Sequence, residues 1–166
     1  MIILGIDPGY AILGWGALEY TGNKFRTLGY GAVTTEPDLR FERRLQIIHD
    51  DLSGILKEYH PEAMAVEKLF FTNNRTTGIG VAEARGVALL SAAQHHAAVY
   101  EYTPMQVKQA VVGYGKAVKK QVMEMTRVLL HLDEIPKPDD TADALAIAIC
   151  HAHCAGSGRR LLEYCR

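Results

Sequence analysis

The most constraining feature of the sequence is a pair of apolar runs, each of which meets a carboxylate. Ile2–Ile6 is apolar apart from one glycine, Asp7 follows at once, and a Pro-Gly pair then stops the run. The segment AMAVEKLFF (63–71) predicts a second buried strand, whose apolar start runs into Glu67. Carboxylates rarely end a buried strand unless something offsets their charge. We therefore expect two interior strands whose acidic ends share a positive partner.

Turn and periodicity signals divide the 166 residues into strands and helices. A turn at 21–24 separates two further strands, and AVYEYT (98–103) predicts the last one. Helices are expected over about 39–59, over about 78–97, from Pro104, over about 117–132 and from Asp139. This order predicts an α/β fold with a mixed five-stranded sheet, three antiparallel strands followed by parallel strands, flanked by helices. We expect one domain over residues 1–166, with a flexible tail from about residue 156.

Composition argues against several classes of protein. Hydrophobic residues make up 48% of the chain, as in a folded domain. No stretch of about 18 apolar residues predicts a membrane span. The first residues lack the basic segment of a secretory signal, so we expect a cytoplasmic protein without membrane attachment. Three cysteines near the C-terminus suit reduced thiols better than a disulfide framework. The net charge of −1 neither favours nor excludes nucleic acid as a partner.

A second acidic pair stands at the start of the last predicted helix. Asp140 and Asp143 are three residues apart, so they share one face of its first turn, where the helix dipole favours negative charge. With Asp7 and Glu67 they make four carboxylates that can meet near the carboxyl ends of the strands. Bare carboxylates at close range repel each other, and Mg²⁺, which prefers oxygen ligands, removes that repulsion. A pair of such ions can hold a phosphodiester for hydrolysis.

Each of these acids also has a simpler interpretation. Asp7 can bond the backbone of the turn that follows it, and Glu67 can pair with the lysine beside it. Asp139 or Asp140 can be the N-cap of the last helix. Asp139 and Asp143 also share a helix face, so spacing does not decide which neighbouring aspartate joins the cluster. The joint placement of two acids after apolar strands favours the metal site.

Four segments of the chain carry a specific resemblance when they are taken together. They are GIDPGY at 5–10, AVEKLFF at 65–71, QVKQAVVGYGKAVKKQV at 106–122 and DDTADALAIAICHAH at 139–153. In this order they resemble the RuvC family, homodimeric bacterial Holliday-junction resolvases with an RNase H-like fold. The resemblance implies a crossover junction endodeoxyribonuclease of DNA recombination and repair. Its paired, metal-dependent cuts would leave 5′-phosphate and 3′-hydroxyl ends.

The resemblance also implies the ligands of the metal. Asp7, Glu67, Asp140 and Asp143 match the catalytic, metal-binding carboxylates of the family. The family's acid-x-x-acid pattern selects Asp140 over Asp139, which leaves Asp139 as the expected helix cap. The implied cofactor is Mg²⁺, with Mn²⁺ as a plausible substitute and two ions expected in each active site.

A basic stretch after Pro104 is the candidate DNA-binding surface. Between residues 104 and 127 there are five basic residues and one acid, which gives a local net charge of +4. Lysines there can contact backbone phosphates, although a solvated helix face is the simpler interpretation. The candidate DNA contacts are Lys108, Lys116, Lys119 and Lys120 in this stretch, and Phe70 and Arg75 near the second acidic strand.

The resemblance refines some of these candidates. It ties Lys108 and Lys119 to DNA binding and catalysis, and Phe70 to stacking at the junction centre, while a core position for Phe70 stays open. His151 matches a position near the active site, which it would support by orienting a carboxylate. We do not expect the motif CHAHC around it to bind zinc, because four ligands in five helical residues cannot all face one ion.

Two other functions are compatible with parts of the sequence. A RuvC-like relative could act on other branched nucleic acid, and a non-catalytic module could bind junctions without cutting them. Four costly carboxylates argue against the module. A two-fold symmetric junction suits a homodimer. The small-residue helix 78–97 is the candidate interface. Burial of this helix against its own sheet explains its composition equally well. The resemblance further implies work alongside the RuvA–RuvB branch-migration complex.

Overall fold

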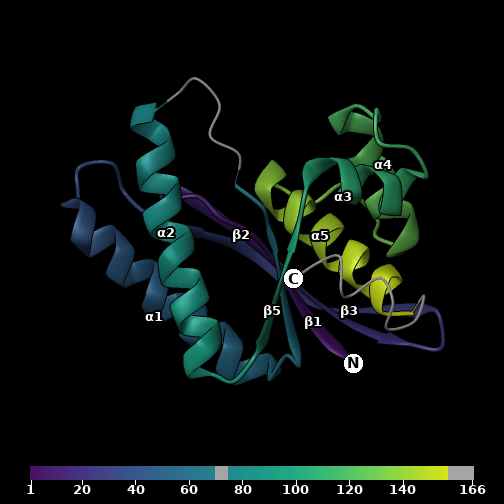
Figure 1. The fold of residues 1–166 in the computed structure, drawn as a ribbon, viewed down its shortest axis with the longest axis horizontal. Coiled ribbons are helices and arrows are strands. Elements are labelled where there is room, and N and C mark those ends of the chain that lie inside the picture. Colours follow the sequence, from purple (N-terminus) through teal and green to yellow (C-terminus); the bar gives the residue numbers. More distant parts are fainter. Residues whose placement is uncertain (70–74, 157–166) are drawn as a thin grey trace.

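A computed structural model describes residues 1–69 and 75–156 of the chain (Figure 1). The strands are β1 (Ile2–Asp7), β2 (Ile12–Thr21), β3 (Lys24–Thr34), β4 (Ala63–Glu67) and β5 (Ala98–Tyr102). The helices are α1 (Phe41–Tyr59), α2 (Arg75–Gln94), α3 (Pro104–Val112), α4 (Lys119–Leu129) and α5 (Asp139–Gly156). The tail that was predicted to be flexible falls on residues 157–166, outside the described residues.

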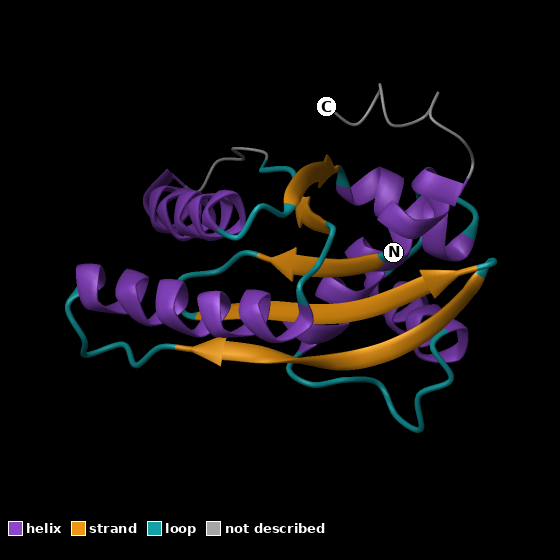
Figure 2. Ribbon diagram, turned by 90° about the horizontal axis from the view of Figure 1, so that it is seen from below, coloured by secondary structure: helices purple, strands orange, loops and turns teal. Residues whose placement is uncertain are grey.

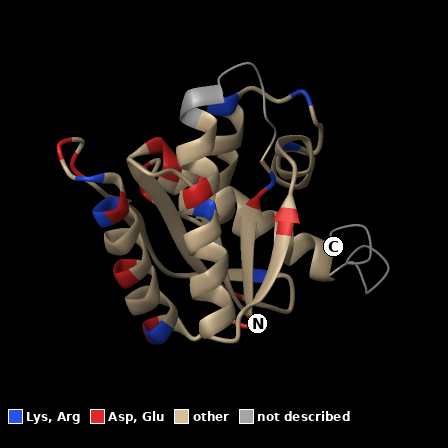
Figure 3. Ribbon diagram, turned by 60° about the vertical axis from the view of Figure 1, so that its left-hand side comes forward, with Lys and Arg blue, Asp and Glu red and all other residues tan. Residues whose placement is uncertain are grey.

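The strands form one mixed sheet in the order β3-β2-β1-β4-β5. The long β2–β3 hairpin (Figure 2) pairs antiparallel with β1, and β4 and β5 add parallel strands on the other side. This arrangement confirms the predicted sheet. Because β1 and β4 are parallel neighbours, Asp7 and Glu67 end their strands at the same edge of the sheet. Figure 3 shows acidic positions at strand ends of the sheet, and Asp7 and Glu67 are the charged residues of β1 and β4.

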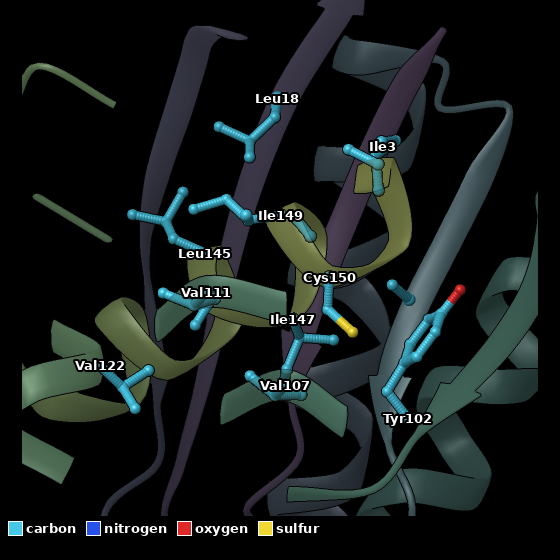
Figure 4. Close-up of a cluster of buried hydrophobic side chains, with 14 of the residues drawn as sticks. Ile3, Leu18, Tyr102, Val107, Val111, Val122, Leu145, Ile147, Ile149 and Cys150 are labelled. Atoms are coloured by element: carbon cyan, nitrogen blue, oxygen red, sulfur yellow. The ribbon is translucent and has the colours of Figure 1, made fainter. Parts of the chain in front are cut away.

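Helices cover both faces of the sheet and enclose two hydrophobic cores. In Figure 1, α1 and α2 lie on one side of the strands, and α3, α4 and α5 lie on the other. Successive residues of a strand point to opposite faces, so Ile3 packs into the core under α5, whereas Leu4 packs into the core under α1 and α2. Figure 4 shows Leu145 and Ile149 of α5 within the first of these cores. The central β1 is therefore buried from both sides.

Two predicted elements have different ends in the structure. The strand predicted over 63–71 ends at Glu67, because its neighbour β5 stops at Tyr102, where a capping box between Thr103 and Gln106 starts α3. The last backbone contact there runs from the Lys68 amide to the carbonyl oxygen of Tyr102, at 2.8 Å. The helix predicted over 78–97 is α2, which begins earlier, at Arg75, and ends at Gln94.

The small residues of α2 face the interior of their own chain. Ala84, Ala88 and Ala92 are fully buried in the core that α2 shares with α1. The opposite side of the helix is different, since Ile79 and Leu90 are 60% and 54% exposed. Burial against the chain's own core therefore accounts for the alanines, and the exposed side is what α2 offers to a partner. No helix in the described ranges combines the length and apolarity needed to cross a bilayer.

Candidate active site

Four elements bring charged side chains to one cavity. Asp7 ends β1, Glu67 ends β4, Asp143 lies in the second turn of α5, and the basic residues come from α3 and α4. The cavity has a volume of about 250 Å³. Its lining comprises Asp7, Glu67, Pro104, Val107, Lys108, Lys119, Val122, Asp143 and Ile147. Three of the four predicted acids and two of the predicted lysines therefore share one space, with apolar walls beside them.

A glycine of β2 allows α5 to reach this edge of the sheet. Gly14 lies opposite Asp7 in the β1–β2 register. A methyl group at position 14 would overlap the carbonyl oxygen of Asp140, so the first turn of α5 rests directly on the Gly14 backbone. Gly14 was not among the residues predicted for the site. Its only signal was a glycine inside a predicted strand, which often marks the close approach of another backbone.

The acids act on one another electrostatically. Burial is the main reason that the pKa of Asp7 rises from its ordinary value of 3.8 to about 8. The negative charges of Glu67, Asp143 and Asp140, in that order, raise the pKa further, and Lys119 opposes them. The pKa of Glu67 is also raised, first by burial and then by Asp143. All four predicted carboxylates thus belong to one electrostatic cluster, although Asp140 does not line the cavity itself.

Lys119 is the cation nearest to the cluster. Its Nζ lies 2.9 Å from Oδ2 of Asp143 and 3.4 Å from Oδ2 of Asp139. The hydrogen bond with Asp143 raises the pKa of Lys119, while burial outweighs the lysine's effect and leaves the pKa of Asp143 above its ordinary value. One lysine cannot neutralise four ionised carboxylates. Additional positive charge, such as a bound cation, would therefore be stabilised at this site.

The structure separates the two neighbouring aspartates at the start of α5. Asp140 contributes to the raised pKa of Asp7, whereas the carboxylate of Asp139 faces Lys119. Asp139 was expected to cap the helix, but it is the first helical residue of α5. Its carboxylate is instead held in the ion pair with Lys119, because α4 starts beside the first turn of α5.

The chemistry of the donors fits a hard divalent cation. Carboxylate oxygens are the ligands that Mg²⁺ prefers. The raised pKa of Asp7 reflects burial first and the neighbouring negative charges second, and a bound cation would favour the ionised carboxylate against both. Within residues 1–69 and 75–156, no three acidic, histidine or cysteine side chains already form a closed metal cage. Closing one would require the acids to draw together, with Asp143 giving up its contact with Lys119.

The other predicted site residues lie at varied distances from the cavity. Lys116 and Lys120 are exposed, and Lys120 borders an apolar groove on the far side of α4. Phe70 and the side chain of Arg75 fall outside the described part of the chain. His151 is 2% exposed and hydrogen-bonds through Nδ1 to the hydroxyl of Tyr102 at 2.7 Å, rather than to one of the four acids. Burial lowers its pKa to about 4, so the ring is neutral.

The chain is similar to known proteins over nearly its whole length. The sequence profile of the family described as crossover junction endodeoxyribonuclease RuvC matches residues 3–151. A protein of that name from Alkaliphilus metalliredigens is 58% identical over 153 residues, which cover 92% of this chain and 93% of the relative. The Thermus thermophilus RuvC structure has a TM-score of 0.88 and 42% identity, and covers 95% of this chain and 97% of that one. T. thermophilus RuvC in complex with a Holliday junction substrate has a TM-score of 0.88, 39% identity and the same coverage.

Proposed function

The chain belongs to the RuvC family of crossover junction endodeoxyribonucleases, and we propose that it resolves four-way (Holliday) DNA junctions by paired hydrolysis of two phosphodiester bonds. One observation carries the proposal. Acids from two parallel strand ends and from α5 face a single cavity together with Lys108 and Lys119. Such a cavity offers negative oxygen ligands for cations and positive groups for phosphates, which are the two requirements of a metal-dependent nuclease.

Asp7, Glu67, Asp140 and Asp143 are the residues that would hold the cofactor, for which Mg²⁺ is the best candidate and Mn²⁺ a substitute. A pair of divalent ions held there would supply a lowered pKa for the attacking water and stabilisation for the charge on the leaving 3′ oxygen. Asp7 must be ionised to act as a ligand, and its raised pKa means that it gives up its proton as a cation enters. The products would be 5′-phosphate and 3′-hydroxyl ends.

The lysines of the cavity would bind the phosphate backbone beside the acids. Lys108 on α3 and Lys119 on α4 line the same space as the carboxylates, so each can reach a phosphate that lies against the metal ligands. Lys116 and Lys120 would extend this contact along the exposed side of the α3–α4 region. These contacts hold the DNA strand in place and make binding salt-dependent without reading its sequence.

The proposed assembly is a homodimer, since two symmetric nicks require two active sites. The exposed side of α2, with Ile79 and Leu90, supports this because large apolar side chains on a helix surface are typical of an interface. By analogy with its family, the protein would work alongside the RuvA–RuvB branch-migration complex.

The proposal is tested with synthetic four-way and linear DNA of the same sequence, each with and without Mg²⁺. We expect symmetric nicks in the four-way DNA alone, only with the metal, and ends that a ligase can seal directly. Asp7→Asn should abolish cutting while junction binding in a gel shift stays intact. Equal cutting of linear DNA, or binding to the four-way DNA without cutting under any divalent cation, would contradict the proposal.

A further inference from the structure

Arg44 is a buried cation that has no acidic partner within residues 1–69 and 75–156. It lies in the first turn of α1 and is only 8% exposed. None of the carboxylates that the structure describes forms an ion pair with it. Burying a charge is unfavourable, and an apolar side chain of similar volume would fill the same space at lower cost. Packing alone therefore does not explain an arginine at this position.

The contacts of Arg44 lead to the segment that follows Asp7. Its Nε donates to Oγ1 of Thr35 at 2.7 Å, and Oγ1 of Thr35 donates to the carbonyl oxygen of Tyr10 at 2.6 Å. The guanidinium carbon also lies 4.8 Å from the centroid of the Tyr10 ring. The amide of Thr35 donates to the carbonyl oxygen of Ala11 at 3.0 Å. Arg44 and Thr35 thus hold both the backbone and the ring of the β1–β2 connection.

Two further elements close around the same ring. Phe41 of α1 meets Tyr10 edge to face, with 5.7 Å between the ring centroids. On the α2 side, a Cβ at Gly80 would lie 2.9 Å from Cδ1 of Tyr10, so the ring sits against bare helix backbone. Residues 8–11 are therefore clamped between α1, α2 and the end of β3, directly after the proposed metal ligand Asp7.

We propose that Arg44 is a positioning residue of the active site, which through Thr35 and Tyr10 fixes the 8–11 segment and so holds the Asp7 carboxylate where the cation binds. This inference rests on the proposed function. Asp7 must be ionised to bind the cation, and in that form the other carboxylates of the cluster repel it, so it would move away from them if the segment behind it were free. A rigid segment prevents that movement and keeps the ligand in place before the cation arrives.

The neighbouring Arg43 provides a matched control, because it is exposed and its side chain hydrogen-bonds to Gln46, at 2.6 Å, with no link to the 8–11 segment among the described residues. Arg44→Met and Arg43→Met remove the same charge from adjacent positions. Three quantities are measured: the Mg²⁺ concentration for half-maximal junction cleavage, the rise in melting temperature caused by Mg²⁺ without DNA, and junction affinity without divalent ions. Arg44→Met should need roughly tenfold more Mg²⁺. It should also lose most of the Mg²⁺-induced rise in melting temperature and keep its junction affinity, while Arg43→Met behaves as wild type.

Thr35 gives a second test that does not depend on how Arg44→Met folds. Thr35→Val removes the hydroxyl that links Arg44 to Tyr10, and Thr35→Ser keeps it. We expect the valine variant to show the raised Mg²⁺ requirement and the serine variant to retain the wild-type value. The double variant Arg44→Met with Thr35→Val should need no more Mg²⁺ than Arg44→Met alone, because the Thr35 hydroxyl transmits the effect of Arg44.

Two results would overturn the inference. If Arg44→Met melts earlier but keeps the wild-type Mg²⁺ requirement, Arg44 only stabilises the fold. If its junction affinity without divalent ions falls while the Mg²⁺ requirement is unchanged, Arg44 contacts DNA instead of positioning Asp7. Failure of the proposed function is a separate outcome, since wild-type protein would then show no Mg²⁺-dependent cleavage at all.

Discussion

At the scale of single residues, Asp7 links catalysis to stability. Without a divalent ion its carboxyl keeps its proton up to about pH 8 in the folded chain, whereas the unfolded chain releases it near 3.8. The folded state then binds more protons than the unfolded state across this range, so the free energy of unfolding should fall as the pH rises through it. The raised pKa of Glu67 acts in the same direction.

We therefore predict that Asp7→Asn stabilises the metal-free protein at pH 8, by on the order of 1–3 kcal/mol, because asparagine cannot ionise. The gain should vanish near pH 4, and Mg²⁺ should stabilise wild type at pH 8 more than it stabilises the variant. Urea unfolding at several pH values measures both effects. Asp51→Asn on the exposed side of α1 is the control. An equal gain from that control would show that the effect is general and does not come from the cluster.

Lys119 influences the pH at which the acids of the same cluster ionise. Its positive charge lowers the pKa of Asp7, Glu67 and Asp143. Lys119→Met should raise these pKa values, so the acidic limb of the cleavage–pH profile should move to higher pH by up to about one unit. Lys57→Met, at the distant end of α1, should leave the limb where it is. A limb that does not move in Lys119→Met would show that another group controls ionisation of the metal ligands.

At the scale of elements, local sequence patterns predicted where strands end and where helices begin. Apolar runs that stop at Asp7 and Glu67 identified both acidic strand ends, and the capping signal at Pro104 located α3. The choice between Asp139 and Asp140 depended on how α5 lies across the sheet, which spacing within one helix does not contain. Contacts between distant segments set the Asp139 carboxylate against Lys119 and bring Asp140 within electrostatic reach of Asp7, and Asp140 as the ligand stays a prediction.

Arg44 was missed although the helical pattern contained a signal for it. It stands four residues before Ile48 and eight before Leu52, so it shares the buried face of α1 with them. A charged residue on an apolar face predicts a buried partner, but nothing local indicates that this partner is Thr35 at the end of β3. Its identity follows only from the packing of α1 against the hairpin.

The contact between α5 and β2 gives a prediction at this scale. Gly14→Ala would push α5 from the sheet beside Asp7, because the new methyl group would overlap the carbonyl oxygen of Asp140. We expect a loss of roughly 1–3 kcal/mol in the free energy of unfolding and a larger relative loss of Mg²⁺-dependent cleavage. Gly54→Ala in α1 meets nothing within 4 Å and should be neutral or stabilising. Full cleavage by Gly14→Ala would separate the position of α5 from catalysis.

At the scale of the whole molecule, the two layers of helices contribute differently to the proposed active site. The layer of α3, α4 and α5 provides the lysines and the α5 acids of the cavity, and the layer of α1 and α2 clamps the 8–11 segment from the other side of the sheet. The exposed side of α2 belongs to this second layer. Dimerisation through α2 would therefore connect the partner chain to the segment that supports Asp7, and leave the lysine-lined cavity open to DNA.

This arrangement predicts the outcome of disrupting the proposed homodimer. Leu90→Asp places a charge on the exposed apolar side of α2, and burying that charge at an interface would cost several kcal/mol. The particle mass by light scattering should halve. On a supercoiled plasmid with an extruded cruciform, paired cuts yield linear DNA and single cuts yield nicked circles, so the variant should shift the product towards nicked circles. Val128→Asp makes the same change at a similarly exposed position on α4 and should keep the dimer. A Leu90→Asp protein that remains dimeric and still yields linear DNA would place the interface elsewhere on the molecule.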